Sequence, residues 1–220
     1  MAQGLNYRLF QASLVLLADD VHAGGVNPDY LAVKGIVPEE WAWEVSSNTM
    51  AAPTASMVTY ENGTKLLAQA GRFQSSHDED GFDPIEKNLD FIANKYVQAN
   101  PDLHYSIIAA NFHAAIFDPE AQSFLKSTLI RDENTARLGF DEVRIVEVLA
   151  NKDDKKIAFH FNTGAATEEE DEKLVLLVRG NFERNCSGYP ASEQACEFVS
   201  KFKDDWKEYQ GLLNKFFIQE

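Results

Sequence analysis

The sequence predicts an α+β fold in which helices pack mainly on one face of an antiparallel sheet. Residues 7–17 and 103–117 are apolar on both strand faces, which is typical of strands in the middle of a sheet. Each is followed by shorter strands and then by a segment with helical apolar spacing. Two such meanders can join into one antiparallel sheet with both closing helices on the same face.

After the strand at 7–17, a short helix is predicted to begin at Asn27-Pro28, because Asn caps helices and Pro suits their first position. Residues 41–46 alternate apolar and polar side chains and predict a half-buried strand. Residues 56–61 and 64–74 flank Asn62-Gly63, and this dipeptide is predicted to supply the two positive-φ residues of a type I′ hairpin turn.

The closing helix of the first half is predicted from Asp83-Pro84, with apolar side chains spaced by three and four residues as far as Tyr96. The second half repeats this order of elements. It predicts a strand at 103–117, a helix from Asp118-Pro119 to about Leu129, and strands at 142–149, 156–163 and 174–182. One long helix is then predicted from Ser192, with an apolar stripe made by Phe198, Phe202, Trp206, Tyr209, Leu213 and Phe216.

The repeated order predicts a single domain, residues 1–220, built of two similar halves, 1–100 and 101–220. A duplicated strand–helix–three-strand–helix unit resembles the saddle-shaped fold of the TATA-box-binding protein. The resemblance lies in topology alone, and a fold does not determine a function.

The charge of the chain argues against the partners that such a saddle is best known for. The formal net charge is -15, and residues 1–100 already carry 6 basic and 13 acidic side chains, so no basic half is hidden. Nucleic acids and acidic membranes attract Lys- and Arg-rich surfaces, so neither is expected as a partner. The two cysteines, Cys186 and Cys196, and the absence of a leader-like segment predict reduced thiols and a cytoplasmic location.

No phosphate-loop, dinucleotide-binding, zinc-protease or nucleophile-elbow motif occurs in the sequence. The candidate ligand-binding residues are polar or aromatic side chains within or near the long strands, since buried polar groups need hydrogen-bond partners and often mark a cavity. They are Gln11, Ser13, Tyr105, Asn111, His113 and His160. The alternative is a hydrogen-bonded core network. No metal and no cofactor are predicted.

Four aromatic residues are candidate interface residues. Trp41 and Trp43 share one face of their predicted strand, and Trp is enriched at binding hot spots. Phe216 and Phe217 widen the apolar surface of the last helix beyond one stripe. The alternative for the tryptophans is packing in the core against a helix. The phenylalanines are expected to contact either a second subunit or the first helix.

These features predict a non-catalytic protein that self-associates or binds a protein partner. The reason is that helices on one face cannot shield the far side of two strands that are apolar on both faces. A small-molecule-binding protein or cofactor-free enzyme, with a pocket near His113, is the first alternative. An acidic mimic of nucleic acid that binds a basic protein is the second.

Overall fold

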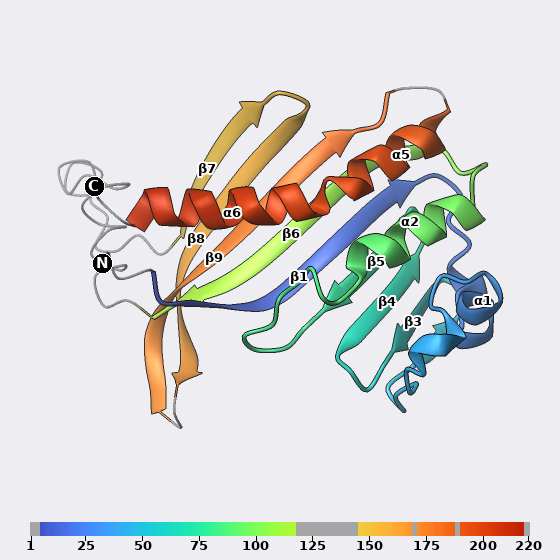
Figure 1. Cartoon of the computed structure of the whole chain (residues 1–220), viewed down its shortest axis with the longest axis horizontal. Coiled ribbons are helices and arrows are strands. Elements are labelled where there is room, and N and C mark those ends of the chain that lie inside the picture. The colour runs from blue at the N-terminus through green and yellow to red at the C-terminus, as the bar shows by residue number, and fades with distance from the viewer. Residues whose placement is uncertain (1–4, 118–144, 169–170, 188–189, 218–220) are drawn as a thin grey trace.

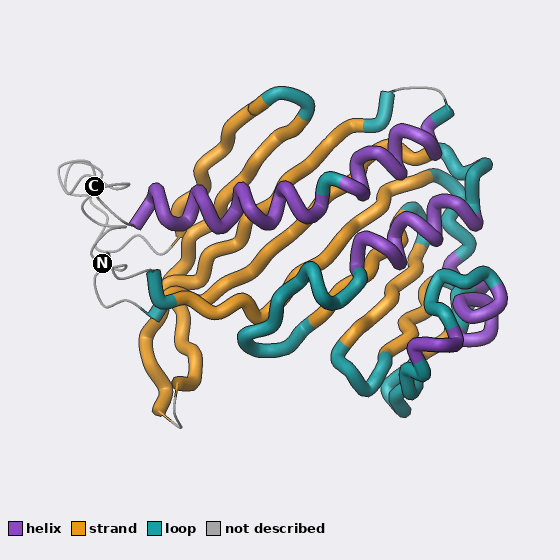
Figure 2. Tube along the Cα trace, in the orientation of Figure 1, coloured by secondary structure: helices purple, strands orange, loops and turns teal. Residues whose placement is uncertain are grey.

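The computed structural model describes residues 5–117, 145–168, 171–187 and 190–217. These residues form one nine-stranded antiparallel sheet in the order β2-β3-β4-β5-β1-β6-β9-β8-β7, with helices on one face (Figures 1 and 2). The α+β antiparallel prediction is therefore confirmed.

The elements follow the chain in two runs. The first run holds β1 (Tyr7–Ala18), α1 (Pro28–Val33), β2 (Met50–Ala52), β3 (Ala55–Thr59), β4 (Thr64–Gln69), β5 (Arg72–His77) and α2 (Leu89–Ala99). The second run holds β6 (Tyr105–Ile116), β7 (Ile145–Lys152), β8 (Lys155–Glu168), β9 (Asp171–Asn185), α5 (Ala191–Ser200) and α6 (Phe202–Phe217). Two short 3-10 turns, Ala23–Gly25 and Glu39–Trp41, lie between β1 and β2.

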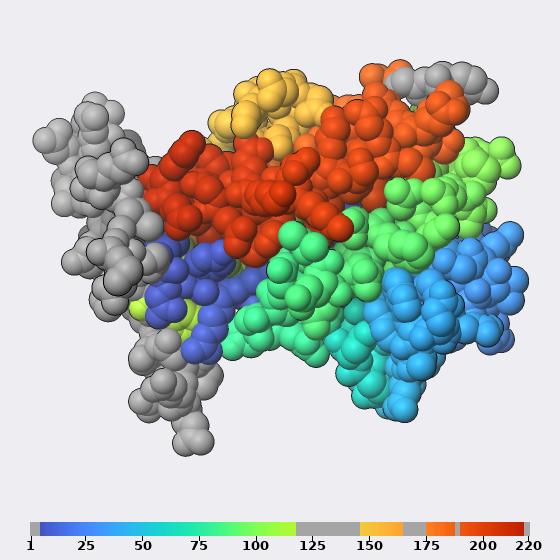
Figure 3. Space-filling model, in the orientation of Figure 1, coloured from blue at the N-terminus to red at the C-terminus, as the bar shows by residue number. Residues whose placement is uncertain are grey.

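The core lies between the sheet and the helices. The central strands β1 and β6 point Leu14, Leu16 and Phe112 toward the helices, and all three are almost fully buried. Burying a side chain of this size contributes about 1.5–3 kcal/mol. Figure 3 shows α2, α5 and α6 covering this face of the sheet, with α2 beside α5.

Aromatic contacts fix the helices on the sheet. The ring of Tyr96 in α2 stacks on Phe73 of β5 with 3.7 Å between ring centroids. In α6, Tyr209 lies directly over Gly180 of β9, where an added Cβ would come within 2.5 Å of the tyrosine ring. A side chain at residue 180 would therefore push α6 off the sheet.

Several predicted boundaries are wrong, each for a local reason. The segment 64–74 is not one strand, because Gly71 takes a φ of 76° and turns the chain between β4 and β5. Residues 41–46 do not form a strand, because Trp41 ends a 3-10 turn and Val45 forms an isolated bridge with Tyr60. The helix expected from Pro84 begins at Leu89, after Asn88 in the left-handed region.

The long final helix is two helices, α5 and α6, separated at Lys201. The short helix at Pro28 is confirmed, and the Asn27 side chain accepts a hydrogen bond of 2.8 Å from the Tyr30 backbone N–H. The helix predicted at 119–129 lies outside the described residues.

Candidate functional site

The face of the sheet opposite α2, α5 and α6 is called the open face here. It carries five of the six predicted ligand-binding residues. In the strand register, His113 lies opposite Gln11 and Arg179, and Asn111 lies opposite Ser13. His160 lies opposite Arg179 on the next strand, so these side chains form two short rows across the centre of the sheet.

Polar side chains on the open face are bonded mainly to one another. The Asn181 Nδ2 group donates to the Asn111 Oδ1 atom at 2.8 Å, and the Asn111 Nδ2 group donates to the Ser13 Oγ atom at 3.4 Å. Gln11 donates to Asp78, which also binds Lys65. These hydrogen bonds pair the polar side chains of the open face with one another, and few polar groups are left directed at a ligand.

The open face carries apolar as well as polar side chains. Ala109, Ala115 and Val15 lie near its centre, and each is less than 9% exposed. Leu17, Ile107 and Leu177 share this face and are half-buried, and Phe10 is 36% exposed. The water-exposed part of this face is therefore a mixture of polar and apolar side chains.

His113 occupies an unusual position on this face. An irregularity in the β1–β6 register between Leu9 and Gln11 places Phe10 beside it, and the two rings meet edge to face at 5.9 Å. Burial, and then the positive charge of Arg179, lower the pKa of His113 to about 4. The imidazole is neutral at pH 7 and is a poor acid–base group at that pH.

His160 lies 3.2 Å from Glu147 and is part of the same row. On the adjacent strand β9, Arg179 lies between His160 and His113. The side chain between the two histidines is therefore a cation and not a carboxylate. Within the described ranges, no group of three or more His, Cys, Asp or Glu side chains could hold a metal ion.

Tyr105 is not on the open face. A second shift in the β1–β6 register, between Leu17 and Ala18, turns Tyr105 toward the helices. The side chain is fully buried and its hydroxyl donates to the Asn100 carbonyl at 3.0 Å. The expected placement beside His113 is wrong because a strict alternation of faces ends at the irregularity.

Trp41 and Trp43 form an aromatic cluster, although on a loop and not on a strand. Their rings lie 4.7 Å apart, Trp41 contacts Phe91 of α2 at 5.2 Å, and Trp43 contacts Tyr60 at 5.2 Å. Both tryptophans are half-buried and Phe91 is 37% exposed. Burial raises the pKa of Tyr60 to about 12, so its hydroxyl stays neutral.

Acidic residues flank the aromatic residues of this cluster along the chain. Glu39, Glu40 and Glu44 are exposed on the same loop, and the Glu61 backbone N–H donates to the Glu44 carbonyl at 2.9 Å. Among the residues that the structure describes, none of these four glutamates forms an ion pair. The four aromatic and four acidic residues are together called the aromatic–acidic patch: Trp41, Trp43, Tyr60, Phe91, Glu39, Glu40, Glu44 and Glu61.

Phe216 and Phe217 are half-buried at the end of α6. Phe216 packs against Phe159 and Phe161 of β8 at 5.5 and 5.3 Å, and Phe217 contacts Phe161 at 6.2 Å. Their inner sides thus belong to the contact between α6 and the sheet.

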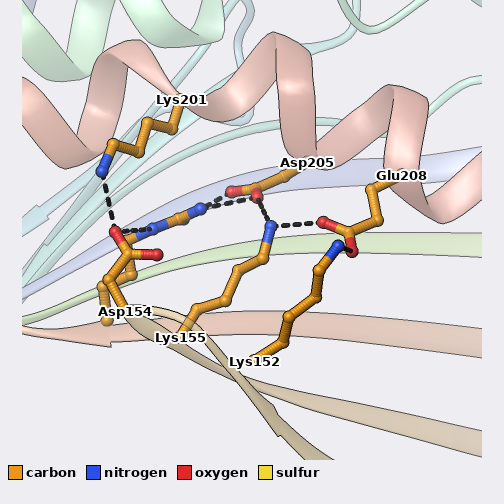
Figure 4. A network of polar contacts seen from close by, with 7 residues as sticks. Lys152, Asp154, Lys155, Lys201, Asp205 and Glu208 are labelled. Atoms are coloured by element: carbon orange, nitrogen blue, oxygen red, sulfur yellow. Dashed lines mark hydrogen bonds and ion pairs between the residues drawn. The ribbon is translucent and has the colours of Figure 1, made fainter.

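A buried ion network joins α6 to the strands of the second half (Figure 4). Arg184 and Asp205 are 3% and 1% exposed, and two hydrogen bonds of 2.6 and 2.8 Å join them. Lys155 bonds to Asp205 at 2.8 Å and also to Glu208, which binds Lys152. The sequence patterns do not predict this network. Its signal is Asp205 on the apolar stripe of α6, between Phe202 and Tyr209.

Thr64, His77 and Glu79 have the order of a nucleophile–base–acid triad. The His77 Nδ1 atom lies 3.3 Å from the Thr64 hydroxyl, and the His77 Nε2 atom lies 2.9 Å from Glu79. Thr64 is fully buried, however, whereas the Glu79 side chain is 45% exposed. A nucleophile must reach its substrate, so this arrangement serves structure and not catalysis.

Neither a protein-family model nor a curated protein matches the chain. None of the helices in the described part of the chain is long and apolar enough to cross a membrane.

Proposed function

We propose that the protein is a non-catalytic, cytoplasmic interaction module, and that the aromatic–acidic patch binds a basic surface of a partner protein. One observation carries the proposal. Tryptophan rings are partly exposed next to glutamates that have no ion-pair partner among the described residues. Interface hot spots are enriched in Trp, Tyr and Arg, which is the composition that such a contact would have.

Arginine is the side chain that fits this patch best. Its planar guanidinium group stacks on aromatic rings and pairs with carboxylates at the same time. One cation already lies over a ring of the patch, since the Lys95 ammonium group lies 5.6 Å from the Phe91 ring centroid. An arginine stacked on Trp41 would meet Glu39 or Glu40 from the same loop.

The charge of the whole chain favours the same class of partner. A net charge of -15 attracts basic proteins over a distance and increases the rate of their association. The patch would then supply specificity, because the aromatic contacts act only at short range.

We further propose that the two halves arose by duplication. The strand order β2-β3-β4-β5-β1 of the first half is mirrored by β7-β8-β9-β6 in the second, apart from the additional edge strand β2. This order supports the saddle-like topology of the TATA-box-binding protein. The proposed function does not depend on it, because all residues of the patch lie in the first half.

The test uses two nonapeptides, one of arginine and one of lysine, with binding measured by calorimetry at physiological ionic strength. The arginine peptide is expected to bind more tightly, and Trp41→Ala is expected to weaken it about tenfold or more. Equal affinity for both peptides would indicate attraction by net charge alone and would contradict the proposal.

A pair of charge-matched triple variants gives the control. Replacing Glu39, Glu40 and Glu44 by Gln should weaken arginine-peptide binding strongly. Replacing Asp19, Asp102 and Glu193 by the corresponding amides removes the same charge elsewhere and should weaken binding only slightly. An equal loss in both triples would show that the patch is not the binding site.

A further inference from the structure

The second half contains a groove that the proposed function does not use. It lies between α6 and the outer strands β7 and β8 and has a volume of about 320 Å³. Its walls are apolar and are formed by Val148, Ala150, Ile157, Phe159, Leu212 and Phe216. This volume falls at the lower end of the range for small-molecule sites.

The groove exists because α6 crosses the outer strands obliquely. Tyr209 places α6 above β9, and Phe216 places its end above β8, so the part of β7 nearest its hairpin with β8 lies beyond the helix (Figure 1). Gly211 lies on the wall that α6 contributes, and nothing lies within 4 Å of the position of a Cβ there. The missing side chain thus leaves space open along the groove.

The charges at the rim are unequal. Glu208 is already bound by Lys152 at 2.6 Å and by Lys155. Lys215 also lines the groove, is exposed, and has no ion-pair partner among the described residues. Of the rim residues that the structure describes, Lys215 is thus a cation available to a ligand next to an apolar channel, whereas the Glu208 carboxylate is already paired.

We propose that this groove binds an aliphatic chain that ends in an anionic group, with the chain against the apolar walls and the anion at the Lys215 ammonium group. A volume of about 320 Å³ lies within the range of sites for small ligands, and decanoate is the probe used.

The first experiment measures calorimetric binding of hexanoate, octanoate and decanoate, each below its aggregation concentration, to the full chain. Affinity should rise with chain length by up to about fourfold per methylene, which is the value for complete burial. An affinity that does not change with chain length, or no binding of decanoate at millimolar concentration, would overturn the proposal.

The second experiment fills the groove from either wall. Gly211→Phe from α6 and, separately, Ala150→Phe from β7 should each lower decanoate affinity at least tenfold. Circular dichroism and thermal unfolding show whether each variant is folded, and the two substitutions act on different elements. Retained affinity in a folded variant would show that decanoate binds elsewhere.

The third experiment separates the anion from the chain. Lys215→Glu should lower the affinity for decanoate but leave the affinity for decanol nearly unchanged. Lys207→Glu on the same helix should change neither affinity. Equal effects of the two lysine variants would contradict the role of Lys215.

Vesicles with anionic headgroups distinguish a free acid from a lipid, since only a lipid ligand would draw the chain to the vesicle surface. The patch of the first half is untouched throughout, so failure here leaves the proposed function to its own test.

Discussion

At the scale of single residues, His113 is the group whose charge depends most clearly on its surroundings. Its pKa is lowered to about 4 in the folded protein, whereas an imidazole in the unfolded chain titrates near 6.5. Between these values the unfolded state binds a proton that the folded state does not. The part of the stability that comes from the neutral His113 side chain is therefore fully present above about pH 6.5 and is lost as the pH falls toward 4.

His113→Gln should remove this part of the pH dependence. The wild-type chain is expected to lose up to about 3 kcal/mol more than the variant between pH 6.5 and 4, measured by urea unfolding at several pH values. His77, whose pKa burial also lowers, contributes with the same sign in both proteins and so does not affect the comparison. NMR signals of the His113 ring that titrate near 6.5 in the folded state would contradict the explanation.

At the scale of elements, the network of Arg184 and Asp205 fastens α6 to β9 and to the hairpin of β7 and β8. Asp205→Ala leaves the buried Arg184 side chain without its main carboxylate partner. It also removes one of the two carboxylates that bind Lys155. Removing one member of a buried pair costs about 3–5 kcal/mol, so the urea midpoint should fall sharply.

Lys201→Ala is the matched control, because Lys201 binds the exposed Asp154 and is itself 32% exposed. Its loss should cost less than about 1 kcal/mol. Similar midpoints for the two variants would mean that the buried pair does not hold α6 in place.

Sequence patterns predicted those elements whose causes are local. A hairpin turn at Asn62-Gly63 and a helix start at Asn27-Pro28 occur where expected. The turn is not type I′, because Gly63 has a positive φ of 84° and Asn62 does not. Gly71 carries the same kind of signal, although it lies within the segment 64–74 that the pattern predicts as a strand. The separation of α5 from α6 at Lys201 has no comparable local signal, because no Gly or Pro marks it.

The candidate sites were predictable only where strand alternation is unbroken. Gln11, Ser13, Asn111, His113 and His160 share a face as alternation requires, whereas Tyr105 lies beyond an irregularity that no residue type announces. The groove beside α6 depends on the position of a helix over distant strands. No spacing within one element contains that information.

At the scale of the whole molecule, the two halves share one sheet and one core. The β1–β6 pair runs through the middle of the sheet, and α2 packs beside α5. The halves should therefore unfold together.

Tryptophan fluorescence can test this, because Trp41 and Trp43 report the first half and Trp206 reports the second. In Trp206→Phe, and separately in the double variant Trp41→Phe and Trp43→Phe, the fluorescence transition in urea should coincide with that of circular dichroism. Separate midpoints within either variant would show that one half unfolds before the other.

The two borders of the sheet differ greatly in length. In the described part of the chain, β2 offers three residues at one border, and β7 offers eight at the other, with Leu149 71% exposed. A strand of eight residues can accept another strand along its free backbone, and one of three residues is a poor template. Two copies that pair edge to edge through β7 would therefore stop at a dimer. The other edge of each sheet, as far as the structure describes it, is the short strand β2. Chains with two long borders lack this limit and can extend into filaments.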